Sequence, residues 1–166
     1  MQFQRVHVIG GGGSGKTTLA RRLASDTGLP LYELDTGVVL DPQEPSWIAE
    51  GVFLWEIEPV LDRADVIVWM DLPRRAAFRR MVTRHIKLTV LRRNPHPGFR
   101  KMLRFVWGQR EYYTAPAREP TGPTDWDALT RALTAELLGP RRAKVVHLRT
   151  PRAVRRWLTS GIHAIR

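Results

Sequence analysis

Residues 10–15, which hold five glycines and one serine directly before Lys16 and Thr17, constrain the fold more than any other stretch. Gly10, Gly15, Lys16 and Thr17 fit the spacing G-x-x-x-x-G-K-[ST] in full. A short apolar run at 5–9 precedes the loop, and apolar residues at helical spacing follow it. The sequence therefore predicts a buried strand, a phosphate-binding loop and a helix in direct succession.

The loop composition has a mechanical meaning. Glycine tolerates positive φ, so the backbone can curl until successive N–H groups face an anion, and a helix that begins near Lys16 adds its positive end to the same place. In such loops the lysine contacts the β- and γ-phosphates and the hydroxyl of the next residue ligates Mg²⁺. We therefore expect the loop to bind a nucleoside triphosphate. We expect ATP rather than GTP, because the chain contains no guanine-reading Asn-Lys-x-Asp element. The expected binding residues are Gly11, Gly12, Gly13, Ser14, Gly15, Lys16, Thr17 and Thr18.

Composition narrows the class of protein. A chain of 166 residues suffices for one domain, expected over 1–166. The absence of cysteine excludes disulfides, thiolate metal sites and cysteine nucleophiles. No apolar run is long enough to span a membrane, so a cytoplasmic location without a membrane partner is expected, while the oligomeric state leaves no signal in the sequence.

Short apolar strands alternate with helical patterns along most of the chain. Such alternation is typical of a parallel sheet with helices on both faces, so a three-layer α/β/α sandwich is expected, with its ligands at the carboxyl edge of the sheet. Thr124, with Asp127 three residues later, has the form of a capping box at the start of a helix. The expected strands are 5–9, 31–35, 47–51, 65–71 and 144–148, and the expected helices are 16–27, 53–63, 74–85, 124–138 and one from 151.

Three acids follow strands and therefore fall at that same edge. Glu50 is the first candidate to hold Mg²⁺; the alternative is a strand-end acid that hydrogen bonds to loops. Asp35 stands where an acceptor would enter, and can orient an acceptor hydroxyl or take its proton; the alternative is a turn leading into Thr36 and Gly37. For Asp71, which precedes Leu72 and Pro73, we favour a cap of the following helix.

Basic residues are concentrated in one segment. Twelve lysines and arginines, and no acid, lie between Asp71 and Glu111, in a chain whose net charge is +11. Arg80 and Arg84 are four apart on one helix face and can clamp a triphosphate, or else form a solvated basic face. Residues 86–114, broken around 94–98, are expected to form a basic lid over the phosphates, with a nucleic-acid surface as the alternative use. We favour packing of its aromatics onto the body, namely Phe99, Phe105 and Trp107.

These stretches resemble the small P-loop kinases of the adenylate kinase-like group, most closely the proteins labelled DNA topology modulation proteins. The resemblance rests on residues 10–17, 47–51 and 64–73, on Arg80 and Arg84, and on 145–154. It implies that Arg149 to Pro151 form the turn that contacts the base. Asp35 and residues 50–53 also look like uridine kinase-type enzymes, in which the corresponding acids serve Mg²⁺ and the nucleoside hydroxyl.

One departure bears on the acceptor. Nucleoside monophosphate kinases of this group follow the third strand with Gly-Phe-Pro-Arg, whose arginine holds the acceptor phosphate, whereas this chain has Gly51, Val52, Phe53 and Leu54. We therefore expect an ATP- and Mg²⁺-dependent kinase whose small-molecule acceptor, a nucleoside, nucleotide or other metabolite, preferably presents a hydroxyl group. Lys16, Asp35, Arg80 and Arg84 are the expected catalytic residues, and Thr17 and Glu50 the expected metal ligands. A nucleic-acid-binding or regulatory NTPase, a nucleoside monophosphate kinase and a nucleotide-binding protein with vestigial catalysis are the alternatives.

Overall fold

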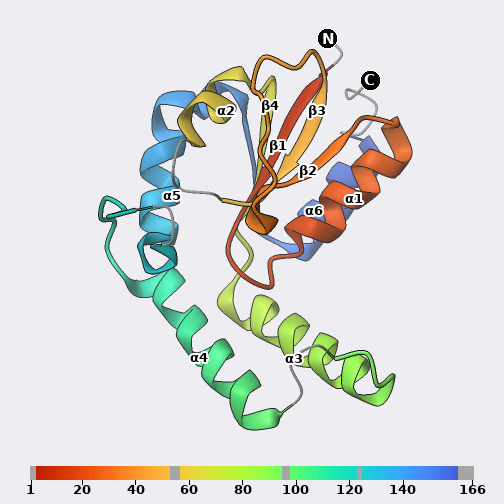
Figure 1. Cartoon of the computed structure of the whole chain (residues 1–166), viewed down its shortest axis with the longest axis vertical. Coiled ribbons are helices and arrows are strands. Elements are labelled where there is room, and N and C mark those ends of the chain that lie inside the picture. The colour runs from red at the N-terminus through yellow and green to blue at the C-terminus, as the bar shows by residue number, and fades with distance from the viewer. Residues whose placement is uncertain (1–2, 53–56, 95–97, 123–124, 161–166) are drawn as a thin grey trace.

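Five parallel strands form the middle layer of the computed structural model, which describes residues 3–52, 57–94, 98–122 and 125–160 (Figure 1). The strand order is β2-β3-β1-β4-β5, so the strand before the glycine loop is central. This arrangement confirms the expected α/β/α fold with a parallel sheet. The strands are β1 (Arg5–Ile9), β2 (Leu31–Glu33), β3 (Trp47–Glu50), β4 (Val66–Met70) and β5 (Val145–Leu148).

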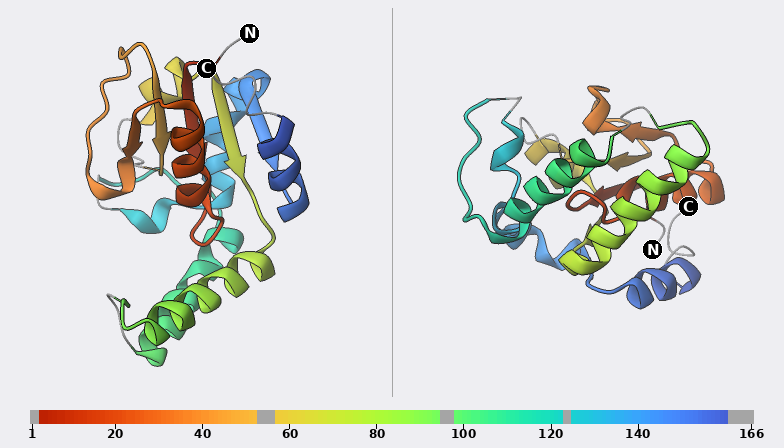
Figure 2. Two further views of the ribbon diagram at one scale, coloured as in Figure 1. Left: turned by 90° about the vertical axis from the view of Figure 1, so that its right-hand side faces the viewer. Right: turned by 90° about the horizontal axis from the view of Figure 1, so that it is seen from below.

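Helices cover both faces of the sheet because alternate strand residues are apolar on each side. Val6 and Val68 belong to the core beneath α1 (Lys16–Thr27) and α6 (Pro151–Ser160). Ile9 and Trp69 belong to the core beneath α2 (Ile57–Arg63) and α5 (Arg131–Leu138). Figures 1 and 2 show these two pairs of helices on opposite sides of the strands. No helix in the described ranges is both long and apolar enough to cross a bilayer.

A hairpin of two helices, α3 (Arg74–Val90) and α4 (Phe99–Thr114), extends beyond the carboxyl edge of the sheet (Figures 1 and 2). Met81, Met102 and Val106 form its small core. This hairpin contains the basic segment expected at 86–114 and begins earlier, at Arg74. Helix α3 runs to Val90 and not to 85, since no helix-breaking residue intervenes before 94–98, of which 95–97 lie outside the described residues.

The helix expected at 124–138 begins later, and that boundary was wrong. Trp126–Ala128 form the 3₁₀ helix η2, and α5 starts at Arg131. Thr130 caps it, because its hydroxyl accepts a 3.0 Å hydrogen bond from the Leu133 amide. The expected cap, Thr124, lies outside the described residues, as does Phe53, the expected start of α2. A further 3₁₀ helix, η3, spans Gly139–Lys144.

Candidate nucleotide and acceptor site

A cleft of about 920 Å³ separates the carboxyl edge of the sheet from the helical hairpin. The glycine loop forms one wall, and side chains of α3 and α4 form the opposite wall. All of the expected loop ligands line this cleft except Ser14, which is buried. Those that line it are Gly11, Gly12, Gly13, Gly15, Lys16, Thr17 and Thr18.

The loop has the backbone form that binding of an anion requires. Gly13 and Gly15 adopt positive φ, 72° and 92°, and Gly15 is the N-cap of α1. No side chain among the described residues caps this helix, so its first amides are left for a ligand. A helix N-terminus that follows a curled glycine loop presents N–H groups and a positive dipole to phosphate oxygens.

Lys16, at the start of α1, reaches both acids of the neighbouring strands. Its Nζ lies 2.5 Å from Asp35 Oδ2 and 2.7 Å from Glu50 Oε1. Asp35 lies in the 3₁₀ helix η1 (Leu34–Thr36) that follows β2, and Glu50 is the last residue of β3. Because β2 pairs with β3 in parallel, the strand ends bring these carboxylates to one edge. Glu50 is therefore an ion-pair partner of the loop lysine.

The two carboxylates set the charge of the lysine. Burial by itself lowers the pKa of Lys16, but Asp35 and then Glu50 offset it, and the pKa is raised above its usual value. The ammonium is therefore fully charged at neutral pH. An incoming triphosphate would exchange one set of anionic partners for another, at little cost in desolvation.

The second carboxylate oxygen of Asp35 is also hydrogen-bonded. Its Oδ1 accepts a 2.9 Å hydrogen bond from the Val52 amide, so the side chain reaches across to the segment that follows β3 and does not form the local turn considered as its alternative. Gly51 makes this approach feasible: its φ is +116°, and a Cβ there would lie 2.5 Å from Asp35 Oδ1. The close contact between Gly51 and Asp35 thus excludes a side chain at residue 51.

Gly51 is itself held by a fully buried histidine. The ring Nε2 of His7 lies 2.9 Å from the Gly51 carbonyl oxygen, to which it donates in the neutral form. Burial outweighs this hydrogen bond and the charge of Asp35, and lowers the pKa of His7 to about 4. His7 therefore stays neutral near pH 7 and supports the backbone next to Asp35.

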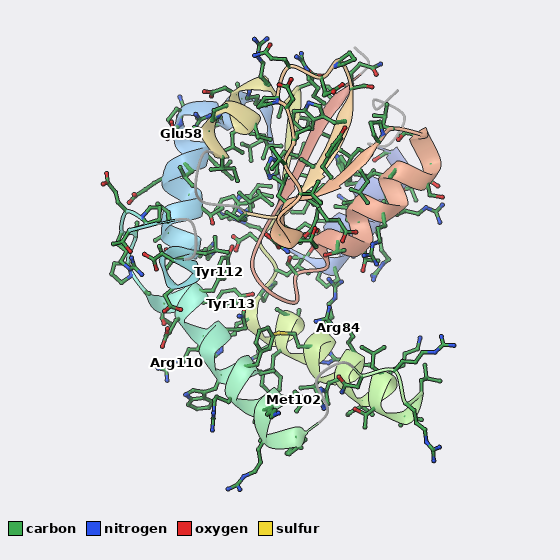
Figure 3. The ribbon with its side chains drawn as sticks, viewed as in Figure 1. Glu58, Arg84, Met102, Arg110, Tyr112 and Tyr113 are labelled. Carbon is green, nitrogen blue, oxygen red and sulfur yellow. The ribbon has the colours of Figure 1, made fainter. Side chains whose placement is uncertain are left out.

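Two arginines of α3 line the hairpin side of the cleft, Arg80 and Arg84. Arg80 Nη1 donates a 2.6 Å hydrogen bond to the Ser14 carbonyl oxygen of the glycine loop. Arg84, one turn further along α3, points up toward the sheet in Figure 3. The two guanidinium groups therefore face the loop, as expected of side chains four residues apart.

Residues near the end of α4 also form part of the cleft, and the sequence analysis missed them. The Tyr112 ring packs against the backbone of Gly11, and the Gln109 side chain contacts Gly12. Figure 3 shows Tyr112 at the end of α4 nearest the sheet, with Met102 between the two helices further out. Glu111 of α4 and Asp127 of η2 line the same cleft. No local sequence pattern indicates these residues, because the loop that they contact lies about a hundred positions earlier in the sequence.

The oxygen atoms near the lysine fit a magnesium ion. Magnesium prefers oxygen ligands, and usually takes one or two carboxylates together with phosphate oxygens and water. Thr17 and Asp35 line the cleft, and the Oε1 atom of buried Glu50 contacts the Lys16 ammonium at 2.7 Å. The described residues contain no cluster of three or more His, Asp or Glu placed to hold a metal.

Asp71 does not cap α3, which corrects the favoured interpretation. Its carboxylate accepts two 2.7 Å hydrogen bonds from Arg131 and lies 2.9 Å from His147 Nε2. His147 in turn stacks on Trp69, with 4.1 Å between ring centroids. Burial raises the pKa of Asp71, but the bonds to Arg131 and His147 lower it by more, so the carboxyl group stays ionised. Asp71 thus ties β4 to β5 and α5.

The expected base-contacting turn, residues 149–151, does not line the cleft. Arg149 is exposed, and neither it nor Pro151 lines the cleft in the described structure. The helix that Pro151 opens contributes Val154 and Leu158 to the cleft wall. An apolar surface that a base could contact is therefore formed one to two turns into α6.

The three hairpin aromatics do not pack the hairpin onto the body, contrary to expectation. Phe99, Phe105 and Trp107 are 63%, 54% and 68% exposed. Val106 and Met102 take the packing positions of α4, since they face α3 while these rings do not. Phe105 alone of the three lines the cleft.

The sheet order, the glycine loop after β1 and the flanking helices together define the fold of P-loop nucleotide kinases. No family model matches the chain, and no curated protein does. Among solved structures, the chain is similar to a gluconokinase from Sinorhizobium meliloti 1021, with 12% identity over 99% of this chain and 93% of that one and a TM-score of 0.47.

Two shikimate kinases are also similar. The one from Bacteroides thetaiotaomicron has 12% identity over 95% of this chain and 97% of that one, with a TM-score of 0.43. The one from Acinetobacter baumannii, solved in complex with shikimate, has 16% identity over 85% of this chain and 94% of that one, with a TM-score of 0.36. Likenesses at this distance assign neither an activity nor a substrate to this chain.

Proposed function

We propose that this protein is a kinase that transfers the γ-phosphoryl group of Mg·ATP to a hydroxyl group of a small acceptor. The observation that carries the proposal is the contact of Lys16 with both Asp35 and Glu50 at the mouth of the glycine loop. This contact joins a phosphate-binding lysine to one carboxylate suited to the metal and another suited to the acceptor.

The donor side uses the loop and the hairpin. Loop amides and the Lys16 ammonium bind the β- and γ-phosphates, while Arg80 and Arg84 face the charge that moves to the leaving oxygen in the transition state. Arg80 is already oriented by the Ser14 carbonyl. The adenine lies toward α6, where Val154 and Leu158 line the cleft. The resemblance assigns base contacts to Arg149 and Pro151 at the start of this helix, and these contacts would form outside the present cleft lining.

Thr17 and Glu50 would hold the magnesium ion, which supplies charge neutralisation on the phosphate oxygens when bound. Glu50 is 2% exposed, so its carboxylate is fixed and desolvated before the nucleotide arrives. Lys16 occupies this carboxylate in the free protein and would share it with the metal in the complex. We assign Glu50 to the metal because its carboxylate is fixed and desolvated beside the lysine of the glycine loop.

Asp35 is the proposed acceptor-side catalytic residue. The acceptor hydroxyl oxygen attacks the γ-phosphorus, forming a new P–O bond, as the bond to the β,γ-bridging oxygen breaks and its electron pair leaves with ADP. The hydroxyl proton passes to the Asp35 carboxylate. One carboxylate oxygen of Asp35 accepts a hydrogen bond from the Val52 amide and the other accepts one from Lys16. These two bonds fix the orientation of the carboxylate.

A phosphorylated acceptor is the less favoured alternative. Between Arg22 and Arg63 the chain carries no lysine or arginine, so β2, β3 and the described loops between them offer no guanidinium or ammonium group to an acceptor phosphate. A nucleoside or another hydroxyl compound is therefore preferred to a nucleoside monophosphate.

A second candidate, a nucleotide-dependent nucleic-acid-binding protein, is favoured by one observation. Phe99 and Trp107 are exposed on a hairpin segment that has twelve basic residues and no acid. Exposed aromatic rings among arginines suit stacking with single-stranded bases. Such binding would weaken steeply as salt is raised.

The experiment that tests the proposal follows ADP release from Mg·ATP with panels of nucleosides, nucleotides, sugars and amino alcohols, and with single-stranded DNA and RNA. Release that a small hydroxyl compound stimulates, and that Lys16→Ala abolishes, supports the kinase. Stimulation by nucleic acid alone supports the second candidate. Hydrolysis at one rate whatever is added contradicts both.

A further inference from the structure

Charge is divided sharply between two stretches of the chain. Residues 23–62 contain nine acids and no lysine or arginine, and residues 72–110 contain twelve lysines and arginines and no acid. The first stretch supplies β2, η1 and β3; the second supplies α3 and most of α4. From the first stretch Asp35 lines the cleft, and from the second Arg80 and Arg84 do.

The cations of the cleft gather where the donor binds. Of the described residues that line it, only Lys16, Arg80 and Arg84 are cationic. Lys16 belongs to the glycine loop, and Arg80 is bonded to it. A triphosphate brings enough negative charge to engage all three groups. None is left for an anionic group on the acceptor.

The remaining charged residues among those described in the cleft lining are acids that come from three separate elements. Asp35 lies in η1, Glu111 near the end of α4 and Asp127 in η2. Glu111 and Asp127 are exposed to solvent and form no ion pair within 4 Å among the described residues, although the charge of Asp127 helps to raise the pKa of Arg118. Both carboxylates are therefore accessible to a ligand in the cleft.

Three arginines on the neighbouring elements are already paired with acids outside the cleft lining. Arg21 pairs with Glu33, Arg118 with Asp125 and Arg131 with Asp71, at 2.6–2.7 Å. A carboxylate or phosphate group on an acceptor would thus meet like charges, whereas an ammonium group would gain charge-assisted hydrogen bonds.

We propose that the acceptor is a hydroxyl compound that carries an amine, such as an amino sugar or an amino alcohol, and that Asp127 and Glu111 bind its ammonium group. The Phe105 ring, which is exposed and lines the cleft, offers a face to the same cation or to the carbon skeleton next to it. This inference rests on the proposed kinase activity and specifies the substrate class of the same site.

The test compares acceptors that share a skeleton and differ in charge. ADP release from Mg·ATP is measured with glucosamine, glucose and gluconate, with ethanolamine and glycolate, with aminopropanediol and glycerate, and with nucleosides against their 5′-monophosphates. We expect the amine-bearing or uncharged member of any active set to exceed its anionic counterpart at least tenfold in kcat/KM, and amines to be the best substrates overall. A preference for a carboxylate- or phosphate-bearing member overturns the inference while leaving the kinase activity standing.

Variants of the acidic side provide the second arm. Asp127→Asn and Glu111→Gln should raise KM for the amine at least tenfold and leave KM for ATP unchanged. The matched controls are Asp41→Asn and Glu44→Gln, which remove acids from an exposed loop outside the cleft lining and should change neither constant. An amine KM that stays unchanged in both cleft variants contradicts the inference. If no compound of any charge stimulates ADP release, the proposed activity itself fails and this inference fails with it.

Discussion

The Lys16 ammonium lies 2.7 Å from a carboxylate oxygen of Glu50, whose side chain is only 2% exposed. A buried carboxylate that loses its cation becomes an uncompensated charge, which costs about 3–5 kcal/mol. We therefore expect Lys16→Met to lower the free energy of unfolding by an amount of that order. Adding Glu50→Gln to Lys16→Met should restore most of the loss, and urea denaturation of both variants measures it. A double variant as unstable as the single one would show that the pair does not balance charge.

The metal assignment makes a separate prediction. If Glu50 binds Mg²⁺ directly or through water, Glu50→Gln should raise the Mg²⁺ concentration needed for half-maximal ADP release by about 10–100-fold. Binding of ATP without metal should change much less, because the loop amides and Lys16 remain. Metal titrations of turnover, beside calorimetric titrations with ATP, measure the two effects. An unchanged metal titration removes Glu50 from the proposed site.

The buried histidine predicts a pH dependence of stability. The pKa of His7 is lowered from 6.5 to about 4 in the folded protein, so between these values the unfolded chain binds a proton that the folded chain does not. Unfolding is therefore favoured as pH falls through this window, by up to about 3 kcal/mol, and is not affected by His7 above it. Denaturation at pH 4.5 and pH 7.5 tests this for the wild type and for His7→Gln. In His7→Gln the free energy of unfolding should differ much less between the two pH values than it does in the wild type. An equal loss of stability at pH 4.5 in both proteins would exclude His7 as the source of the pH dependence.

The contact between Gly51 and Asp35 predicts that residue 51 accepts no side chain. In Gly51→Ala the new Cβ would press on Asp35 Oδ1 in a backbone conformation with φ +116°, a strain worth about 1–3 kcal/mol. We expect lower stability and a fall in kcat larger than any change in KM for ATP. Gly139→Ala is the control, since a Cβ at residue 139 meets nothing within 4 Å and its backbone is α-helical. Equal behaviour of the two variants would contradict the geometry.

Much of the fold was predictable because its signals are local. The glycine loop, its strand and its helix are consecutive in sequence, and the other strands are short apolar runs separated by helical patterns. Asp35 and Glu50 come together with Lys16 because parallel strands end at one edge, a rule that needs only the strand assignments. The chemical roles of these residues remain predictions.

The errors arose where a local pattern competed with contacts from distant residues. Asp71 stands before a proline-initiated helix and so resembles a cap, but its partner Arg131 is 60 residues away. The Thr124 and Asp127 spacing resembles a capping box, yet Thr130 caps α5 without an acid at the third helical position. Strand order and the approach of Tyr112 to the glycine loop also depend on long-range packing, which a single sequence does not display.

The most direct test of the central claim is to identify the phosphorylated product by ³¹P NMR after incubating the wild-type protein with Mg·ATP and the best acceptor. We predict one phosphate monoester for each ADP formed, none with Lys16→Met, and formation about 10²–10⁴-fold slower with Asp35→Asn. The control Asp41→Asn, in an exposed loop, should match the wild type. Inorganic phosphate as the sole product, or equal rates for the Asp35 variant and the wild type, would contradict a hydroxyl-directed kinase built on Lys16, Asp35 and Glu50.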